Sequence, residues 1–118
     1  MSDKHYDLEE GTLKFARQVR ALVTKLPKTA GNLKDGDQSI RSSGSVGANY
    51  IEANESLGGK DFIFRIKICK KESKESRFWL KLIDTNSLVI LDQERLALIQ
   101  EATELMNIFG SIVRKCEP

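Results

Sequence analysis

Four carboxylates lie on two neighbouring segments that both have helical spacing. Glu52 and Glu55 are on the first segment, and Glu72 and Glu75 are on the second. If the two segments packed together, such acids could share a proton and act as general acid and general base. Desolvated carboxylates more often belong to structural ion pairs, so we interpret these residues as structural.

The structural alternative is a polar network between the same two segments. Networks of this kind fix the register of packed helices more than they add stability. We predict that Asn49, Glu52 and Glu75 are held by Arg41, or by the hydroxyls of Ser73 and Ser76.

The remaining chemistry-bearing residues form no catalytic or metal-binding set. His5 is the single histidine, whereas a di-iron bundle needs Glu-x-x-His on two helices and a Ser-His or Cys-His pair also needs histidine. No phosphate loop or dinucleotide-binding glycine motif occurs. Cys69 and Cys116 form no C-x-x-C motif, and Cys69 lies on a core stripe as a small hydrophobe. We therefore expect no enzyme activity, no cofactor, no metal and no small-molecule substrate.

Positive charge is concentrated in residues 60–81, which carry eight basic and three acidic side chains, although the whole chain has a net charge of only +2. A solvated helix face is the simplest interpretation of such a run. Like-charged residues four positions apart, however, cost about 0.2–0.5 kcal/mol per pair. The pairs are Lys67 with Lys71, Lys70 with Lys74, and Arg77 with Lys81. This self-repulsion favours an anionic partner.

We therefore predict that the chain binds RNA or another nucleic acid through phosphate contacts that do not read sequence. The predicted contact residues are Lys14, Arg17, Lys67, Lys70, Lys71, Lys74 and Arg77. A protein-interaction or scaffold module that engages an acidic protein is the alternative. Tyr50, Phe78 and Trp79 could stack on bases, but aromatic residues at helical spacing more often form core or subunit contacts.

Four stretches carry apolar residues at three- and four-residue spacing, which predicts four amphipathic helices. These span approximately residues 7–26, 32–57, 60–84 and 92–115. Asp7 and Asp92 are the predicted N-caps of the first and last helices. The second helix could begin anywhere from 29 to 37, and Gly58 and Gly59 are expected to end it.

Helices of similar length joined by short connections favour antiparallel neighbours. The predicted fold class is all-α, an antiparallel up-down-up-down four-helix bundle forming a single domain over residues 1–118. Gly44 and Gly47 are expected to let a neighbouring helix approach closely. The third helix is apolar on more than one side because Phe64, Phe78 and Leu82 lie outside its core stripe.

The N-terminal residues are polar, and the longest aliphatic run covers only residues 88–91. No signal peptide or membrane segment is indicated, so we expect a cytoplasmic protein.

Four segments together are similar to one known family. They read Leu-Pro-Lys at 26–28, Arg-Ser-Ser-Gly-Ser-Val-Gly-Ala-Asn-Tyr-Ile-Glu-Ala at 41–53, Lys-Asp-Phe at 60–62, and Lys-Glu-Ser-Lys-Glu-Ser-Arg-Phe-Trp-Leu at 71–80. The chain resembles the four-helix bundle proteins encoded in intervening sequences of bacterial 23S rRNA genes.

The resemblance implies a protein without an established catalytic activity. Similar proteins, among them the accessory proteins of diversity-generating retroelements, look like ring-shaped homopentamers with basic surfaces implicated in nucleic-acid binding. A homo-oligomer, with a pentamer favoured, is thus expected, and a ring would explain the extra apolar side of the third helix. Arg41, Asn49, Glu52 and Glu75 match the polar positions characteristic of the family.

Overall fold

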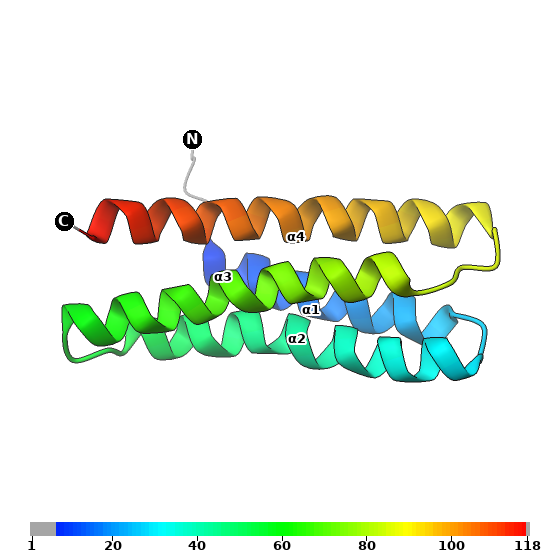
Figure 1. Cartoon of the computed structure of the whole chain (residues 1–118), viewed down its shortest axis with the longest axis horizontal. Helices are drawn as coiled ribbons and strands as arrows, with labels where there is room; N and C mark the ends of the chain where they lie inside the picture. Colours follow the sequence, from blue (N-terminus) through cyan, green and yellow to red (C-terminus); the bar gives the residue numbers. More distant parts are fainter. Residues whose placement is uncertain (1–6, 118) are drawn as a thin grey trace.

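Four helices pack in chain order around one core (Figure 1). The computed structural model describes residues 7–117. The helices are α1 Leu8–Lys25, α2 Ala30–Asn54, α3 Gly59–Leu82 and α4 Val89–Cys116. Each helix packs against two neighbours, and α1 and α4 are also neighbours. The diagonal pairs α1/α3 and α2/α4 have no Cα atoms within 8 Å of each other. The predicted all-α bundle is confirmed.

Contacts between helices show that neighbouring helices run antiparallel. Asn32 at the start of α2 contacts the backbone of Asp84 just after α3, whereas Asn49 near the end of α2 contacts Arg65 near the start of α3. At the end of the bundle where α1 stops and α4 begins, Lys25 pairs with Glu94. Asn54 at the end of α2 donates to Glu9 at the start of α1, so the chain runs up, down, up and down.

Side-chain caps fix the starts of the first two helices. The Asp7 carboxylate accepts hydrogen bonds from the backbone N–H groups of Glu9 and Glu10, as predicted. Thr29 caps α2 by accepting from the backbone N–H of Asn32 at 3.1 Å. Because this hydroxyl satisfies a free helix-end donor, α2 begins at Ala30, within the predicted range of 29–37.

The predicted ends of the second and third helices were wrong. The second helix ends at Asn54 rather than 57, because Leu57 is fully exposed and no core contact extends the helix to it. Gly58 and Gly59 instead form the N-cap and first residue of α3. The third helix ends at Leu82 rather than 84, where the Asn32 side chain binds both the N–H and the C=O of Asp84.

The prediction of Asp92 as the N-cap of the last helix was also wrong. Asn86 and Ser87, both with positive φ, turn the chain early, so α4 begins at Val89 with Leu88 as its N-cap. The Asp92 carboxylate lies within the first turn of α4. There it accepts hydrogen bonds from Thr85 and Arg95.

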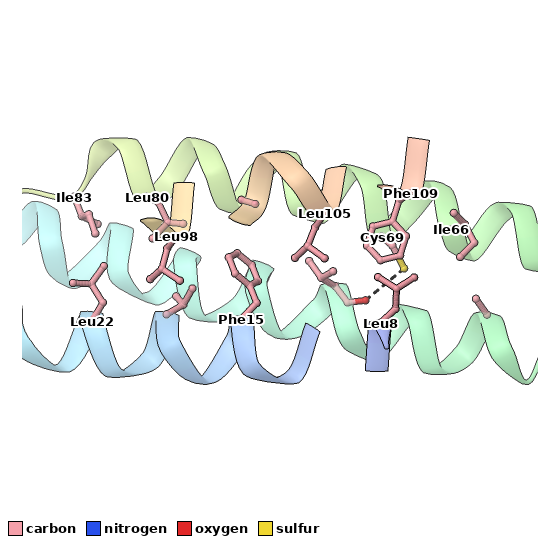
Figure 2. Close-up of a cluster of buried hydrophobic side chains, with 14 of the residues drawn as sticks. Leu8, Phe15, Leu22, Ile66, Cys69, Leu80, Ile83, Leu98, Leu105 and Phe109 are labelled. Carbon is pink, nitrogen blue, oxygen red and sulfur yellow. Dashed lines mark hydrogen bonds between the residues drawn. The ribbon is translucent and has the colours of Figure 1, made fainter. Parts of the chain in front are cut away.

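The core runs along the bundle axis and is built mainly from aliphatic side chains, of which leucine is the most frequent (Figure 2). Phe15, Leu22, Leu80, Leu105 and Phe109 are all at most 1% exposed. These residues come from α1, α3 and α4, so one face of each of these helices supplies most of the large core side chains.

Cys69 is part of this core. Its thiol lies 3.4 Å from the carbonyl oxygen of Val46, and burial raises its pKa to about 12. The thiol therefore stays protonated and unreactive, consistent with its predicted role as a small hydrophobe.

The α1/α2 contact is close at one of the two predicted glycines. A Cβ added at Gly47 would meet the Thr12 hydroxyl oxygen at 2.9 Å, whereas one added at Gly44 would meet nothing within 4 Å. Gly36, which the sequence did not single out, is equally close to Val23. Close approach is thus confirmed at Gly47, and the prediction for Gly44 was wrong.

Candidate nucleic-acid interface

The cations of α3 divide between two sides of the helix. Lys67, Lys70 and Arg77 reach toward α4, and Lys71 lies beside Glu75, which is bound from α2. The predicted basic stripe is therefore concentrated along the α3/α4 junction. Long side chains on these two antiparallel helices can share one surface there.

Each cation on the α4 side contacts a particular residue. The Lys67 ammonium lies 2.9 Å from the Glu117 carboxylate. The Arg77 guanidinium donates to the Thr103 hydroxyl at 3.5 Å. Lys70 lies over Gly110 of α4, close to Arg114. Arg114 therefore belongs with the α3 cations.

Sequence reasoning missed Arg114, although its spacing of four residues from Gly110 carried a signal. A long side chain on a helix leans back over the preceding turn, so Arg114 covers a residue that has no side chain of its own. Lys74 lies one helical turn beyond Lys70 on α3. We call the set comprising Lys67, Lys70, Lys74, Arg77 and Arg114 the basic face.

The basic face is poor in internal counter-charge. Within residues 7–117, Lys70, Lys74, Arg77 and Arg114 form no ion pair, and Lys67 has Glu117 alone. The α4 residue that accepts a hydrogen bond from Arg77 is Thr103, which is neutral. Exposed cations in this arrangement are available to an anion from solution.

Lys14 and Arg17 do not join this face. Both line a shallow hollow along the outer side of α1, with Leu13 and Ala21. Helix α1 is diagonal to α3 in the bundle, and their backbones do not approach. The structure thus places these two predicted contact residues on a separate surface.

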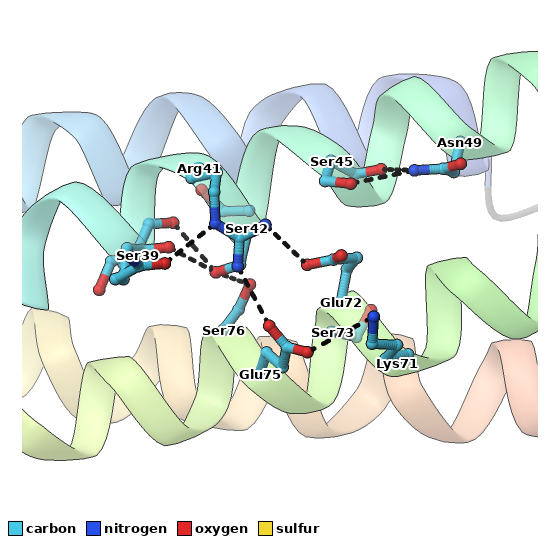
Figure 3. A network of polar contacts seen from close by, with 12 residues as sticks. Ser39, Arg41, Ser42, Ser45, Asn49, Lys71, Glu72, Ser73, Glu75 and Ser76 are labelled. Carbon is cyan, nitrogen blue, oxygen red and sulfur yellow. Dashed lines mark hydrogen bonds and ion pairs between the residues drawn. The ribbon is translucent and has the colours of Figure 1, made fainter.

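The α2/α3 junction differs at Arg41, a cation that is matched by acids (Figure 3). Arg41 lies 3.4 Å from the carboxylate of the buried Glu72 and 3.1 Å from that of Glu75. Its Nε also donates to Gln38 at 2.9 Å. One guanidinium therefore compensates two carboxylates of α3.

Small hydroxyl side chains let α2 and α3 pack closely beside this ion pair. The Ser76 hydroxyl donates to the Ser42 hydroxyl at 2.9 Å, and both residues are fully buried. We call the group formed by Gln38, Arg41, Ser42, Glu72, Glu75 and Ser76 the polar seam.

The predicted polar network is only partly assembled in the structure. Arg41 and Glu75 meet, and Glu72 joins them. Asn49 lies apart, where it accepts from Arg65 at 3.1 Å and donates to Ser45. Glu52 is exposed, and its carboxylate contacts none of the other predicted members. The four carboxylates considered for catalysis therefore do not converge.

Exposed apolar side chains occur on one side of α3, interrupted by Lys71 and Glu75, and we call them the apolar stripe. Phe64, Phe78 and Leu82 are 58%, 55% and 50% exposed. Phe78 also stacks edge to face on Trp79, with ring centroids 5.1 Å apart. Large apolar groups grouped on a surface mark contacts with other molecules more often than isolated ones do.

Known families and structures can now be compared with this arrangement. The family model of the 23S rRNA-intervening sequence proteins matches residues 5–111. The chain belongs to this family. A solved relative of this intervening-sequence protein is a protein of unknown function from the S23 ribosomal protein family of Bacteroides thetaiotaomicron. The two are 26% identical with a TM-score of 0.78, over 91% of this chain and 98% of the relative.

No curated protein matches this intervening-sequence protein. Within residues 7–117, no helix is both long and apolar enough to span a membrane. The same part of the chain contains no group of three side chains that could hold a metal ion. His5 lies outside the described residues.

Proposed function

We propose that this intervening-sequence protein is a non-catalytic, homo-oligomeric bundle that binds RNA or another nucleic acid through the basic face. The observation that carries the proposal is the excess of unpaired cations along the α3/α4 junction. Two antiparallel helices present these cations as one elongated surface, which suits a phosphate backbone. We place this activity in the cytoplasm, in keeping with two cysteines that are both unpaired.

Salt dependence is the first test of backbone binding. Each phosphate neutralised on a single strand contributes a slope of about −0.7 to the plot of log K against log salt, so four contacts predict roughly fifty-fold weaker binding between about 50 and 200 mM salt. Binding of a fluorescent oligoribonucleotide, followed by anisotropy, measures this slope. A slope near zero would exclude phosphate contacts as the source of affinity.

Charge reversal tests whether the basic face is the binding surface. Lys70→Glu with Lys74→Glu should abolish oligoribonucleotide binding while circular dichroism remains unchanged, because both side chains are exposed. Lys14→Glu with Arg17→Glu is the matched control, since it reverses two exposed charges on the diagonal helix. Equal losses in the two double variants would mean that net charge, not this face, determines binding.

The apolar stripe of α3 supports self-association. Burying three large side chains that are half exposed in the single chain would give a favourable hydrophobic contribution to assembly. The family resemblance favours a pentamer. Light scattering should give the mass of an oligomer for the parent chain and a smaller mass for Phe64→Ser with Phe78→Ser. A parent chain that is monomeric at all concentrations would contradict self-association.

The same stripe favours a second candidate function, a protein-interaction module without nucleic-acid binding. Exposed aromatic residues beside charged ones are common in protein interfaces. Purification with and without nuclease separates the two functions, because a partner held through nucleic acid is lost after nuclease treatment. Retention of a protein partner together with a flat salt response would favour the second function.

A further inference from the structure

Two cations of the basic face converge on the one buried glycine of α4. A Cβ added to Gly110 would lie 3.4 Å from Nη1 of Arg114 and 3.7 Å from Nζ of Lys70. Gly110 itself is buried beneath these side chains. The point that a methyl group would occupy is therefore flanked by two cationic nitrogens from two different helices.

This convergence brings two like charges near one glycine, where an anion would relieve their repulsion. Like charges held close together repel each other, and neither Lys70 nor Arg114 forms an ion pair within residues 7–117. Arg114 leans back over the preceding turn, as long helical side chains do, and this brings its guanidinium to the same glycine as Lys70. An oxygen atom placed between the two nitrogens would accept hydrogen bonds from both.

In the neighbouring turn of α3, a lysine at the same junction already binds a carboxylate oxygen. Lys67, one turn before Lys70, has an oxyanion at 2.9 Å, supplied by the chain's own Glu117. The α3/α4 junction therefore accommodates an anionic oxygen beside a lysine ammonium. At Gly110 the corresponding position has two cations and no carboxylate.

We infer that Lys70 and Arg114 form a phosphate-binding site over Gly110. This inference rests on the proposed function, and it assigns one phosphate group of the bound nucleic acid to a defined position. Arg114 would contact the phosphate through its planar guanidinium and Lys70 through its ammonium. Because Gly110 has no side chain, a phosphate oxygen can approach the backbone of α4 to van der Waals distance beside the two cations.

Titration with inorganic phosphate at constant ionic strength tests the site without nucleic acid. The Gly110 amide signal in a ¹⁵N-correlated NMR spectrum should shift in a saturable way. Lys70→Gln with Arg114→Gln should weaken the apparent affinity about tenfold or more, because two charge-assisted hydrogen bonds are lost. Lys14→Gln with Arg17→Gln removes one lysine and one arginine elsewhere and should leave the titration unchanged. A response equal in both double variants, or absent from Gly110, would overturn the inference.

Gly110→Ala provides a test that keeps every charge. The added Cβ is at ordinary contact distance from both cations, so the helix can accept it, and the methyl group keeps a phosphate oxygen farther from the backbone of α4. We expect phosphate to bind about tenfold more weakly, with unchanged folding. If Gly110→Ala binds phosphate as tightly as the parent chain, the site does not lie over this glycine.

Oligoribonucleotide binding by the same variants separates this inference from the proposed function. If RNA binds with a steep salt slope but Gly110→Ala and Lys70→Gln with Arg114→Gln both leave phosphate binding intact, the inference fails and the function stands. If the phosphate site responds as expected but RNA does not bind, the proposed function fails. The assignment of this phosphate to nucleic acid then fails with it.

Discussion

The two sides of α3 differ in their charged residues and in the partners of those residues. Toward α2, the cation Arg41 meets both Glu72 and Glu75 inside the chain. Toward α4, Lys70 and Lys74 have no carboxylate within the described residues, and Lys67 has only Glu117. A charged residue on this helix thus contributes to the fold where a partner is built in, and is available for binding where it is not.

The largest loss of stability is expected from a substitution in the closely packed polar seam. Ser76→Leu would force additional carbon atoms between α2 and α3, where Ser42 and Ser76 are fully buried, so we expect a loss of about 3 kcal/mol in the free energy of unfolding. Urea unfolding at one protein concentration measures it. Asn107→Leu, at an exposed position of α4, is the control. A similar change in both variants would show that the seam is not tightly packed.

Removing one cation from the α2 side of α3 should lower folding stability, whereas removing one from the α4 side should weaken nucleic-acid binding. Arg41→Ala leaves the buried Glu72 without its cationic donor, so we expect a loss of about 1–2 kcal/mol in the free energy of unfolding. Lys74→Ala should leave the urea midpoint unchanged and weaken oligoribonucleotide binding. The two variants are therefore expected to give opposite results in the two measurements. Equal effects on stability would remove the distinction between the two sides.

Most of the fold could be predicted because helical periodicity depends on local sequence. The stripe containing Phe15, Val19 and Leu22 predicts one buried face, and all three side chains are in the core. Helix ends depended on contacts between segments distant in sequence. The side chain of Asn32 hydrogen-bonds the backbone of Asp84 just after the end of α3. No local sequence pattern reveals this tertiary contact.

The candidate interface was less predictable, because charge spacing identifies a helix face but not its neighbour. Lys70 and Lys74 could be grouped from their spacing on one helix. Whether Lys14 lies beside them depends on which helices are diagonal, and Arg114 joins them only because α4 is antiparallel to α3. Glu72 entered the polar seam for the same reason, since its burial depends on the position of α2.

A smaller effect is expected at Trp79, where α3 has a buried polar group without a partner. Its indole N–H has no hydrogen-bond acceptor within the described part of the chain. Trp79→Phe removes this unpaired donor and some apolar contact, so the free energy of unfolding should change by less than about 1 kcal/mol. Thermal unfolding measures the difference. A loss as large as that of Ser76→Leu would indicate that the indole packs more tightly than its unpaired N–H suggests.

The smallest effect should come from the carboxylate that already lies on the basic face. Glu117→Gln removes the counter-charge of Lys67, an exposed ion pair that contributes little to stability. Oligoribonucleotide affinity should rise about two- to threefold at low salt, and the gain should shrink as salt screens the interaction. Glu94→Gln, which frees Lys25 on the α1/α4 side, is the matched control and should leave affinity unchanged. A larger gain from Glu94→Gln would move the binding surface from α3 to α1.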